Sequence, residues 1–250
     1  MKQDETKKQP VDRRSFLKTA ATGGAALVAS ATTSATASAA VQQVAASAAA
    51  DTAPAAQLKP GSDFMMDVLK QLDFEYMMIN PHSDSAGLQE SVINYTGNKN
   101  PELITCLHEE AAVAMAHGYY KIAGKPLAAL IYGSVGLQHA SMAVYSAFCD
   151  RVPVYLLLGN ALDTIGSRSV QDAAAMVREY TKFDDAPISW SHFAEGAVRA
   201  YAVATTPPTM PVAVVIDKKL QEDNIPAGTK LRVPKYTPNT PPVGDAAARS

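Results

Sequence analysis

The sequence has few of the residues that mark several large classes of protein. Only two of its 250 residues are cysteines, Cys106 and Cys149, too few for a disulfide framework and without the paired spacing of a zinc site. The net charge of -2 shows no basic excess and argues against a nucleic-acid-binding surface. No apolar run is long enough to span a bilayer as a stable helix. No G-x-G-x-x-G segment follows the first expected strand, which counts against a dinucleotide site.

The first 39 residues have the layout of an export signal. A polar, Lys-containing lead-in is followed by DRRSFLK over 12–18, a short Ala/Gly/Val stretch, and Ala-x-Ala sites such as the one over 37–39. This segment resembles a twin-arginine signal peptide, which predicts a periplasmic or otherwise exported protein. The alternative is a chance Arg-Arg pair in a disordered tail. Residues 40–59 are rich in Ala and lack aromatics, so we expect an Ala/Pro-rich linker there.

From residue 60 onward, strand and helix patterns alternate. Short apolar runs predict strands over 76–79, 103–106, 127–132, 154–158 and 211–216. Helical spacing or composition predicts helices over 64–72, 88–93, 109–122, 137–148, 170–180 and 192–204. This alternation predicts one α/β domain over 60–223, a parallel sheet with helices on both faces. Residues 224–250 are Pro-rich and read as a tail or linker.

Three loops leave the carboxyl ends of the expected strands, where ligands of such sheets bind. They carry Asn-Pro-His-Ser over 80–83, Leu-His-Glu over 107–109 and Gly-Ser-Val-Gly over 133–136. We expect these loops to converge on one edge. His108, His117 and His139 show no metal-ligand spacing, so no metal site is expected among these residues.

Three segments carry a resemblance to a known family: HEEAAVAMAHGYYKIAGKP from residue 108, GSVGLQHA from 133 and DRVPVYLLLGN from 150. They are similar to the pyrimidine-binding domain of thiamine diphosphate enzymes of the acetolactate synthase, benzoylformate decarboxylase and pyruvate decarboxylase group. The resemblance implies a thiamine diphosphate-binding fold, a small 2-oxo acid substrate, and carbon-carbon lyase or transferase chemistry. It also implies an oligomer whose cofactor site is shared.

The resemblance gives Glu109 a defined role. Its carboxylate would hydrogen-bond N1′ of the aminopyrimidine and activate that ring for ylid formation. The alternative is that Glu109 only complements the positive end of its helix, an effect of roughly 0.3–1 kcal/mol. The neighbouring Glu110 is assigned to this second role.

The other expected site residues come from the loops around Glu109. For cofactor binding, besides Glu109, the resemblance points to Pro81, Gly133, Ser134, Val135, Gly136 and Leu137. On the substrate side it points to His82, Ser83 and Tyr132. His82 replaces a glycine of the family pattern, and Tyr132 stands where some decarboxylases place a catalytic His, which weakens a decarboxylase assignment. The alternative for 80–83 is an ordinary Asn-Pro turn with a solvated His.

The family's diphosphate-binding domain, with its Gly-Asp-Gly segment, has no counterpart in this sequence. Magnesium would therefore be held only through a domain absent from this chain, and we expect no activity from the chain alone. One interpretation is a pyrimidine half-site, truncated or completed by a partner subunit or a homo-oligomer. A second is a non-catalytic exported binding or interaction module that retains the fold. A third is an unrelated flavodoxin-like or Rossmann-like domain.

Overall fold

The computed structural model describes residues 59–161 and 170–238 of the chain. The expected signal peptide over 1–39 and almost all of the linker over 40–59 lie outside the described residues. So does the end of the expected tail, residues 239–250.

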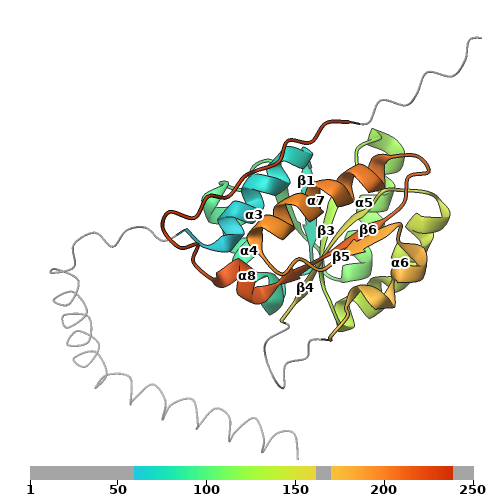
Figure 1. The fold of residues 1–250 in the computed structure, drawn as a ribbon. Coiled ribbons are helices and arrows are strands. Elements are labelled where there is room, and N and C mark those ends of the chain that lie inside the picture. Colours follow the sequence, from blue (N-terminus) through green and yellow to red (C-terminus); the bar gives the residue numbers. More distant parts are fainter. Residues whose placement is uncertain (1–58, 162–169, 239–250) are drawn as a thin grey trace, which may run out of the picture. The chain divides into compact units, whose positions relative to one another are not determined.

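Six parallel strands form one sheet in the described part of the chain (Figure 1). Their order across the sheet is β2-β1-β3-β4-β6-β5. The strands are β1 (Tyr76–Ile79), β2 (Glu102–Thr105), β3 (Ala128–Tyr132), β4 (Tyr155–Asn160), β5 (Phe183–Asp185) and β6 (Val212–Asp217). Every strand pair is parallel, so all carboxyl ends lie at the same edge. This confirms the predicted α/β fold class.

Helices cover both faces of the sheet (Figure 1). On one face lie α3 (Gly61–Leu69), α4 (Ala86–Glu90) with the π-helical turn Ser91–Tyr95, and α7 (Trp190–Thr205). On the other face lie α5 (Glu109–Ala123) and α6 (Val135–Cys149). The short helix α8 (Lys218–Glu222) follows β6.

Two separate cores result from the alternation of side chains along each strand. In β1, Met77 and Ile79 pack into the core under α3 and α7, whereas Met78 packs into the core under α5 and α6. In β4, Leu157 and Leu158 divide between the two cores in the same way. Strands buried on both faces read as continuous apolar runs, which is why the sequence predicts them well.

The strand order reverses between β1 and β3. From β1 the chain moves outward to β2, whereas from β3 it moves in the opposite direction to β4. In sheets of this kind, ligands bind at the carboxyl ends of the strands where the order reverses. This is the edge at which the sequence places its candidate site.

The segment between β4 and β5 differs from the sequence prediction. The expected helix over 170–180 is wrong: the structure has two 3-10 turns, Ala174–Met176 and Arg178–Tyr180. The Arg178 guanidinium pairs with both Asp172 and Asp184 at 2.9 Å, which fastens the turns to the following strand. That strand, β5, joins the sheet only through β6.

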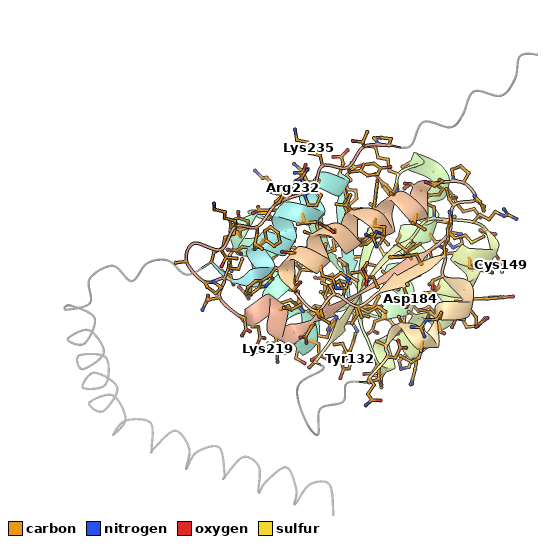
Figure 2. All side chains as sticks on the ribbon, in the orientation of Figure 1. Tyr132, Cys149, Asp184, Lys219, Arg232 and Lys235 are labelled. Atoms are coloured by element: carbon orange, nitrogen blue, oxygen red, sulfur yellow. The ribbon has the colours of Figure 1, made fainter. Side chains whose placement is uncertain are left out.

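Residues 224–238 pack along the domain. Ile225 N donates to Lys59 O over 2.9 Å, and the Tyr236 ring meets the Tyr201 ring edge-on with centroids 4.9 Å apart. Arg232 and Lys235 project outward from this segment (Figure 2). The first part of the expected tail is thus anchored to α7.

Two further features bear on the class of protein. Cys106 is buried and Cys149 is exposed, and neither forms a disulfide. None of the described helices combines the length and apolar character that crossing a membrane requires.

Candidate functional site

The carboxyl edge of the sheet holds a buried carboxylate at the start of α5. Glu109 is the first residue of this helix and is 7% exposed, whereas Glu110 is exposed. His108 caps the helix, with its Nδ1 accepting from Glu110 N over 3.3 Å. Within residues 59–161 and 170–238 the Glu109 carboxylate makes no hydrogen bond or ion pair. Its oxygens are not among the fully buried oxygens that lack a partner, so the carboxylate of this largely buried residue keeps some access to solvent at the carboxyl edge of the sheet and is available to a ligand there.

The Glu109 carboxylate lies directly against the first turn of α6. A Cβ added at Gly136 would stand 2.6 Å from Glu109 Oε1 and 2.9 Å from Tyr132 Cβ. Any other residue at 136 would have to displace one of these groups. Gly136 therefore allows its own backbone, the Glu109 carboxylate and Tyr132 at the end of β3 to pack closely together.

The loop after β1 places the His82 ring beside the ends of β3 and β4. Its centroid lies 5.4 Å from that of Tyr132, at an interplanar angle of 30°. A Cβ added at Gly159 would stand 2.5 Å from His82 Cε1. Figure 2 labels Tyr132 at this end of the sheet. His82 thus occupies a packed position, which contradicts the alternative of a solvated His.

Burial dominates the electrostatics of His82. It lowers the pKa of the imidazole from 6.5 to about 4, against the opposing influence of the Asp84 and Glu109 carboxylates. His82 is therefore neutral at neutral pH. Because both carboxylates influence the pKa of this ring, Asp84 and Glu109 both lie near His82.

Two glycines bring the loops after β3 and β4 together. Gly133 N donates to Gly159 O over 2.8 Å, and a Cβ at Gly133 would stand 2.6 Å from that same oxygen. The three loops that the sequence expected to converge do so here: 80–83 reaches Gly159 through His82, and 133–136 reaches Glu109 through Gly136.

Three buried side-chain oxygens make no hydrogen bond among the described residues, and all three lie at this edge. They are Asp84 Oδ2, Ser134 Oγ and Asn160 Oδ1. Ser134 was expected from the sequence, but Asp84 and Asn160 were not. The Gly-Asn pair that ends β4 in the DRVPVYLLLGN segment was the signal for Asn160. Buried acceptors without partners favour the binding of a hydrogen-bond donor.

The other predicted site residues take different positions. Pro81, Ser83 and Val135 are exposed at the rim of the edge. Ser83 Oγ donates to Asp84 Oδ1 over 3.2 Å. Leu137 is fully buried in the core under α5 and α6.

Two histidine rings from the start of α5 and from α6 lie against each other. The rings of His108 and His139 meet edge-on with centroids 4.8 Å apart. No group of three or more His, Cys, Asp or Glu residues able to hold a metal ion occurs in the described part of the chain.

Comparison with known proteins shows what this part of the chain is similar to. Residues 59–175 match the family model of the thiamine pyrophosphate enzyme, N-terminal TPP binding domain. The chain is 25% identical over 167 residues to the acetolactate synthase large subunit of Haemophilus influenzae, covering 66% of this chain and 29% of that protein. It is 25% identical over 184 residues to the same subunit of Lactococcus lactis subsp. lactis, covering 70% and 31%. The matched region is thus less than a third of these curated relatives.

A solved structure shows the same fold. The benzoylformate decarboxylase of Polynucleobacter necessarius superposes with a TM-score of 0.63 at 20% identity. The superposition covers 72% of this chain and 33% of that one.

Proposed function

Because residues 59–175 match the family model of the thiamine pyrophosphate enzyme, N-terminal TPP binding domain, we propose that the edge around Glu109 binds the aminopyrimidine half of thiamine diphosphate. The observation that carries this proposal is the carboxylate of the largely buried residue Glu109, which has no protein partner among the described residues and lies against Gly136. A protonated ring nitrogen is the donor that such a carboxylate lacks. The glycine leaves room for the carboxylate itself, since any side chain at 136 would displace it from this position.

Glu109 would act by holding a proton between its carboxylate and the ring nitrogen. Thiamine diphosphate supplies, when bound, a nucleophilic carbon for attack on a carbonyl substrate. Glu109 would set the protonation of the pyrimidine, and its burial would keep water from competing for that hydrogen bond. Gly133, Ser134 and Gly136 would line the ring, with Ser134 Oγ as a further polar contact.

The described residues fit one half of the cofactor only. No acidic cluster suited to a metal ion occurs among them, whereas a magnesium diphosphate needs several oxygen ligands. We propose that the diphosphate and Mg²⁺ bind outside residues 59–238, on a partner subunit or on another part of a longer protein. Residues 59–238 alone would then have no activity.

The substrate would be a small 2-oxo acid, and the reaction class a carbon-carbon lyase or transferase reaction. This assignment is supported by the acetolactate synthase relatives. His82, Ser83 and Tyr132 would lie on the substrate side, because the loop after β1 and the end of β3 flank Glu109.

Exposed apolar side chains on and beside α5 and α6 support the proposal that the chain assembles with another subunit. The large apolar side chains that α5, α6 and the residues preceding α5 leave exposed are Leu107, Met115, Ile122, Val135, Met142 and Tyr145. Exposed apolar patches of this kind mark interaction surfaces. The partner would be a second copy of the chain or a subunit that carries the diphosphate domain. Export by the twin-arginine pathway would deliver the folded protein to the periplasm.

The incomplete cofactor site also favours a second candidate, a non-catalytic exported module that retains the fold. The two candidates differ in one experiment. The full chain is mixed with a separately produced subunit that carries a Gly-Asp-Gly diphosphate domain, and the mixture is assayed with pyruvate, thiamine diphosphate and Mg²⁺. Activity that Glu109→Gln abolishes and Glu110→Gln retains supports the enzyme. Activity that survives Glu109→Gln contradicts the proposed role of this residue, and no activity supports the non-catalytic module.

A further inference from the structure

The side chain of Gln221 connects α8 to the turn that follows β1. Gln221 is fully buried in this short helix. Its Nε2 donates to Asp84 O over 2.8 Å, and its Oε1 accepts from Leu88 N over 3.2 Å. Longer contacts of 3.4 Å join Nε2 to Ile216 O and Asp217 O at the end of β6. One amide therefore ties the turn to both α8 and β6.

The two backbone groups that this amide contacts belong to residues four positions apart. In a continuous α-helix the N–H of Leu88 would donate directly to the carbonyl oxygen of Asp84. Here the backbone changes from the 3-10 turn Ser83–Ser85 to α4 between these two residues, and the Gln221 amide bridges the pair. An amide can form this bridge because it carries both a donor and an acceptor, as a peptide group does. The side chain thus acts as a peptide group at the start of α4.

Close packing on both sides of the bridge holds α8 in place. A Cβ added at Gly87 in α4 would stand 2.9 Å from Gln221 Cβ. The neighbouring residue of α8, Leu220, accepts at its backbone oxygen from Trp190 Nε1 over 2.8 Å. A Cβ added at Gly61, the first residue of α3, would overlap both of these atoms. The helix that carries Gln221 is therefore fixed to α3 and α7.

The bridge also holds the turn against the carboxyl end of β4. The Asp84 oxygen that accepts from Gln221 lies 3.2 Å from the point that a Cβ at Gly159 would take. The Cε1 atom of His82 lies 2.5 Å from the same point. Without the bridge, Asp84 O and Leu88 N would each lose a hydrogen-bond partner in a buried position, which is costly. Movement of the turn away from Gly159 would relieve that cost.

We propose that Gln221 is a positioning residue of this edge: its amide holds the turn after β1 against Gly159, and this placement keeps the Glu109 carboxylate available to a ligand. A turn that moved away would expose the His82 ring to water and allow it to become charged. The charged ring would attract Asp84 and Glu109, the two carboxylates that already act on it. The ligand rests on the function proposed above, whereas the placement of the turn does not.

The placement of the turn is tested by titrating His82 in the full chain, followed by histidine NMR, with His82→Gln to identify its signals. In the wild type, burial lowers the pKa of His82 to about 4, so the ring stays neutral at pH 6. Gln221→Met removes both hydrogen bonds and keeps a side chain of similar length. We expect the His82 pKa to rise toward 6.5 in this variant, because the ring becomes hydrated. A His82 pKa equal to that of the wild type overturns the proposal.

Two further variants separate positioning from a general loss of stability. Gly87→Ala keeps the amide but pushes against Gln221 Cβ, so it should raise the His82 pKa as well, and it tests the bridge even if Gln221→Met does not fold. Tyr155→Phe is the matched control, because it removes a buried hydrogen bond of 2.9 Å to Ala197 O at the first residue of β4. It should lower resistance to urea and leave the His82 pKa unchanged. Equal pKa shifts in Tyr155→Phe and Gly87→Ala overturn the positioning role.

The consequence for the ligand is tested by calorimetric titration of the full chain with thiamine at pH 6. We expect roughly tenfold weaker binding in Gln221→Met and Gly87→Ala than in the wild type and Tyr155→Phe, since a charged His82 would compete for Glu109. Equal affinity in all four proteins overturns the link between the turn and the ligand. Absence of binding by the wild type contradicts the function proposed above together with this link, whereas the His82 titration decides the positioning role independently.

Discussion

Glu109 and Gly136 occupy adjoining positions, with Glu109 Oε1 only 2.6 Å from the point that a Cβ at residue 136 would take. The contact joins the first turn of α5 to the first turn of α6 across the carboxyl ends of the strands. It makes the carboxylate part of a wall that a flat ring can approach.

Gly136→Ala should displace the Glu109 carboxylate. The added methyl group would also meet Tyr132 Cβ at 2.9 Å, so we expect a loss of about 1–3 kcal/mol in unfolding free energy together with weaker thiamine binding. Urea unfolding and calorimetric titration measure the two effects.

Gly118→Ala is the matched control for this change. Gly118 also lies within a helix, but a Cβ there meets nothing within 4 Å. We expect it to raise stability by about 0.5–1 kcal/mol and to leave thiamine binding unchanged. Equal effects of the two substitutions would contradict the proposed wall.

Gly159→Ala should act through His82. The new Cβ would stand 2.5 Å from His82 Cε1 and 3.2 Å from Asp84 O, so either the ring or the turn after β1 must move. We expect a loss of about 1–3 kcal/mol. The ring nitrogen signals of His82 should also change, as histidine NMR would show. Unchanged His82 signals would mean that the ring does not pack on Gly159.

Stability should fall as the pH drops from 6.5 to 4. Burial lowers the folded-state pKa of His82 to about 4, while Asp84 and Glu109 oppose that shift. The unfolded chain therefore binds more protons in this range. The stabilisation is present above pH 6.5 and is lost as the pH falls toward 4, by up to about 3 kcal/mol.

The variant His82→Gln isolates this contribution. Urea unfolding across the same range should give a smaller decrease in the variant than in the wild type. Parallel curves for the two proteins would show that His82 titrates normally.

The apolar face of α5 and α6 should mediate assembly. Met142 is 67% exposed on α6, and a charge there would have to be desolvated in an interface. We expect Met142→Glu to weaken association of the full chain at least roughly tenfold in sedimentation experiments. Ile188→Glu, a change at an 82% exposed position outside these helices, is the control and should have no effect. Dissociation by Ile188→Glu alone would place the interface elsewhere.

The sequence predicts the buried strands well and the sheet margin poorly. The run over 76–79 is β1 as predicted, because its residues are apolar on both faces. β5 is Phe-Asp-Asp, which has no apolar alternation and is a strand only because it pairs with β6. The helix predicted over 170–180 is wrong for a similar reason. The backbone of this segment follows the ion pairs of Arg178 with Asp172 and Asp184, and no local sequence pattern indicates those pairs.

For the site, the sequence predicts residues that stand in recognisable motifs, and it misses residues that become notable only because folding buries them. Glu109 and Gly136 stand in motifs that can be recognised. Asp84 and Asn160 are ordinary polar residues in the sequence, and only folding buries an oxygen of each without a partner among the described residues. The packing of His82 on Gly159 likewise joins residues far apart in the chain.

The most direct test of the account is calorimetric titration of the full-length protein with thiamine, which carries the aminopyrimidine but no diphosphate. We predict binding by the wild type and by Glu110→Gln, and at least roughly tenfold weaker binding by Glu109→Gln at unchanged folding, because the carboxylate that holds the ring proton is gone. Equal thiamine affinity in Glu109→Gln and wild type would contradict the claim that Glu109 is the pyrimidine-binding carboxylate.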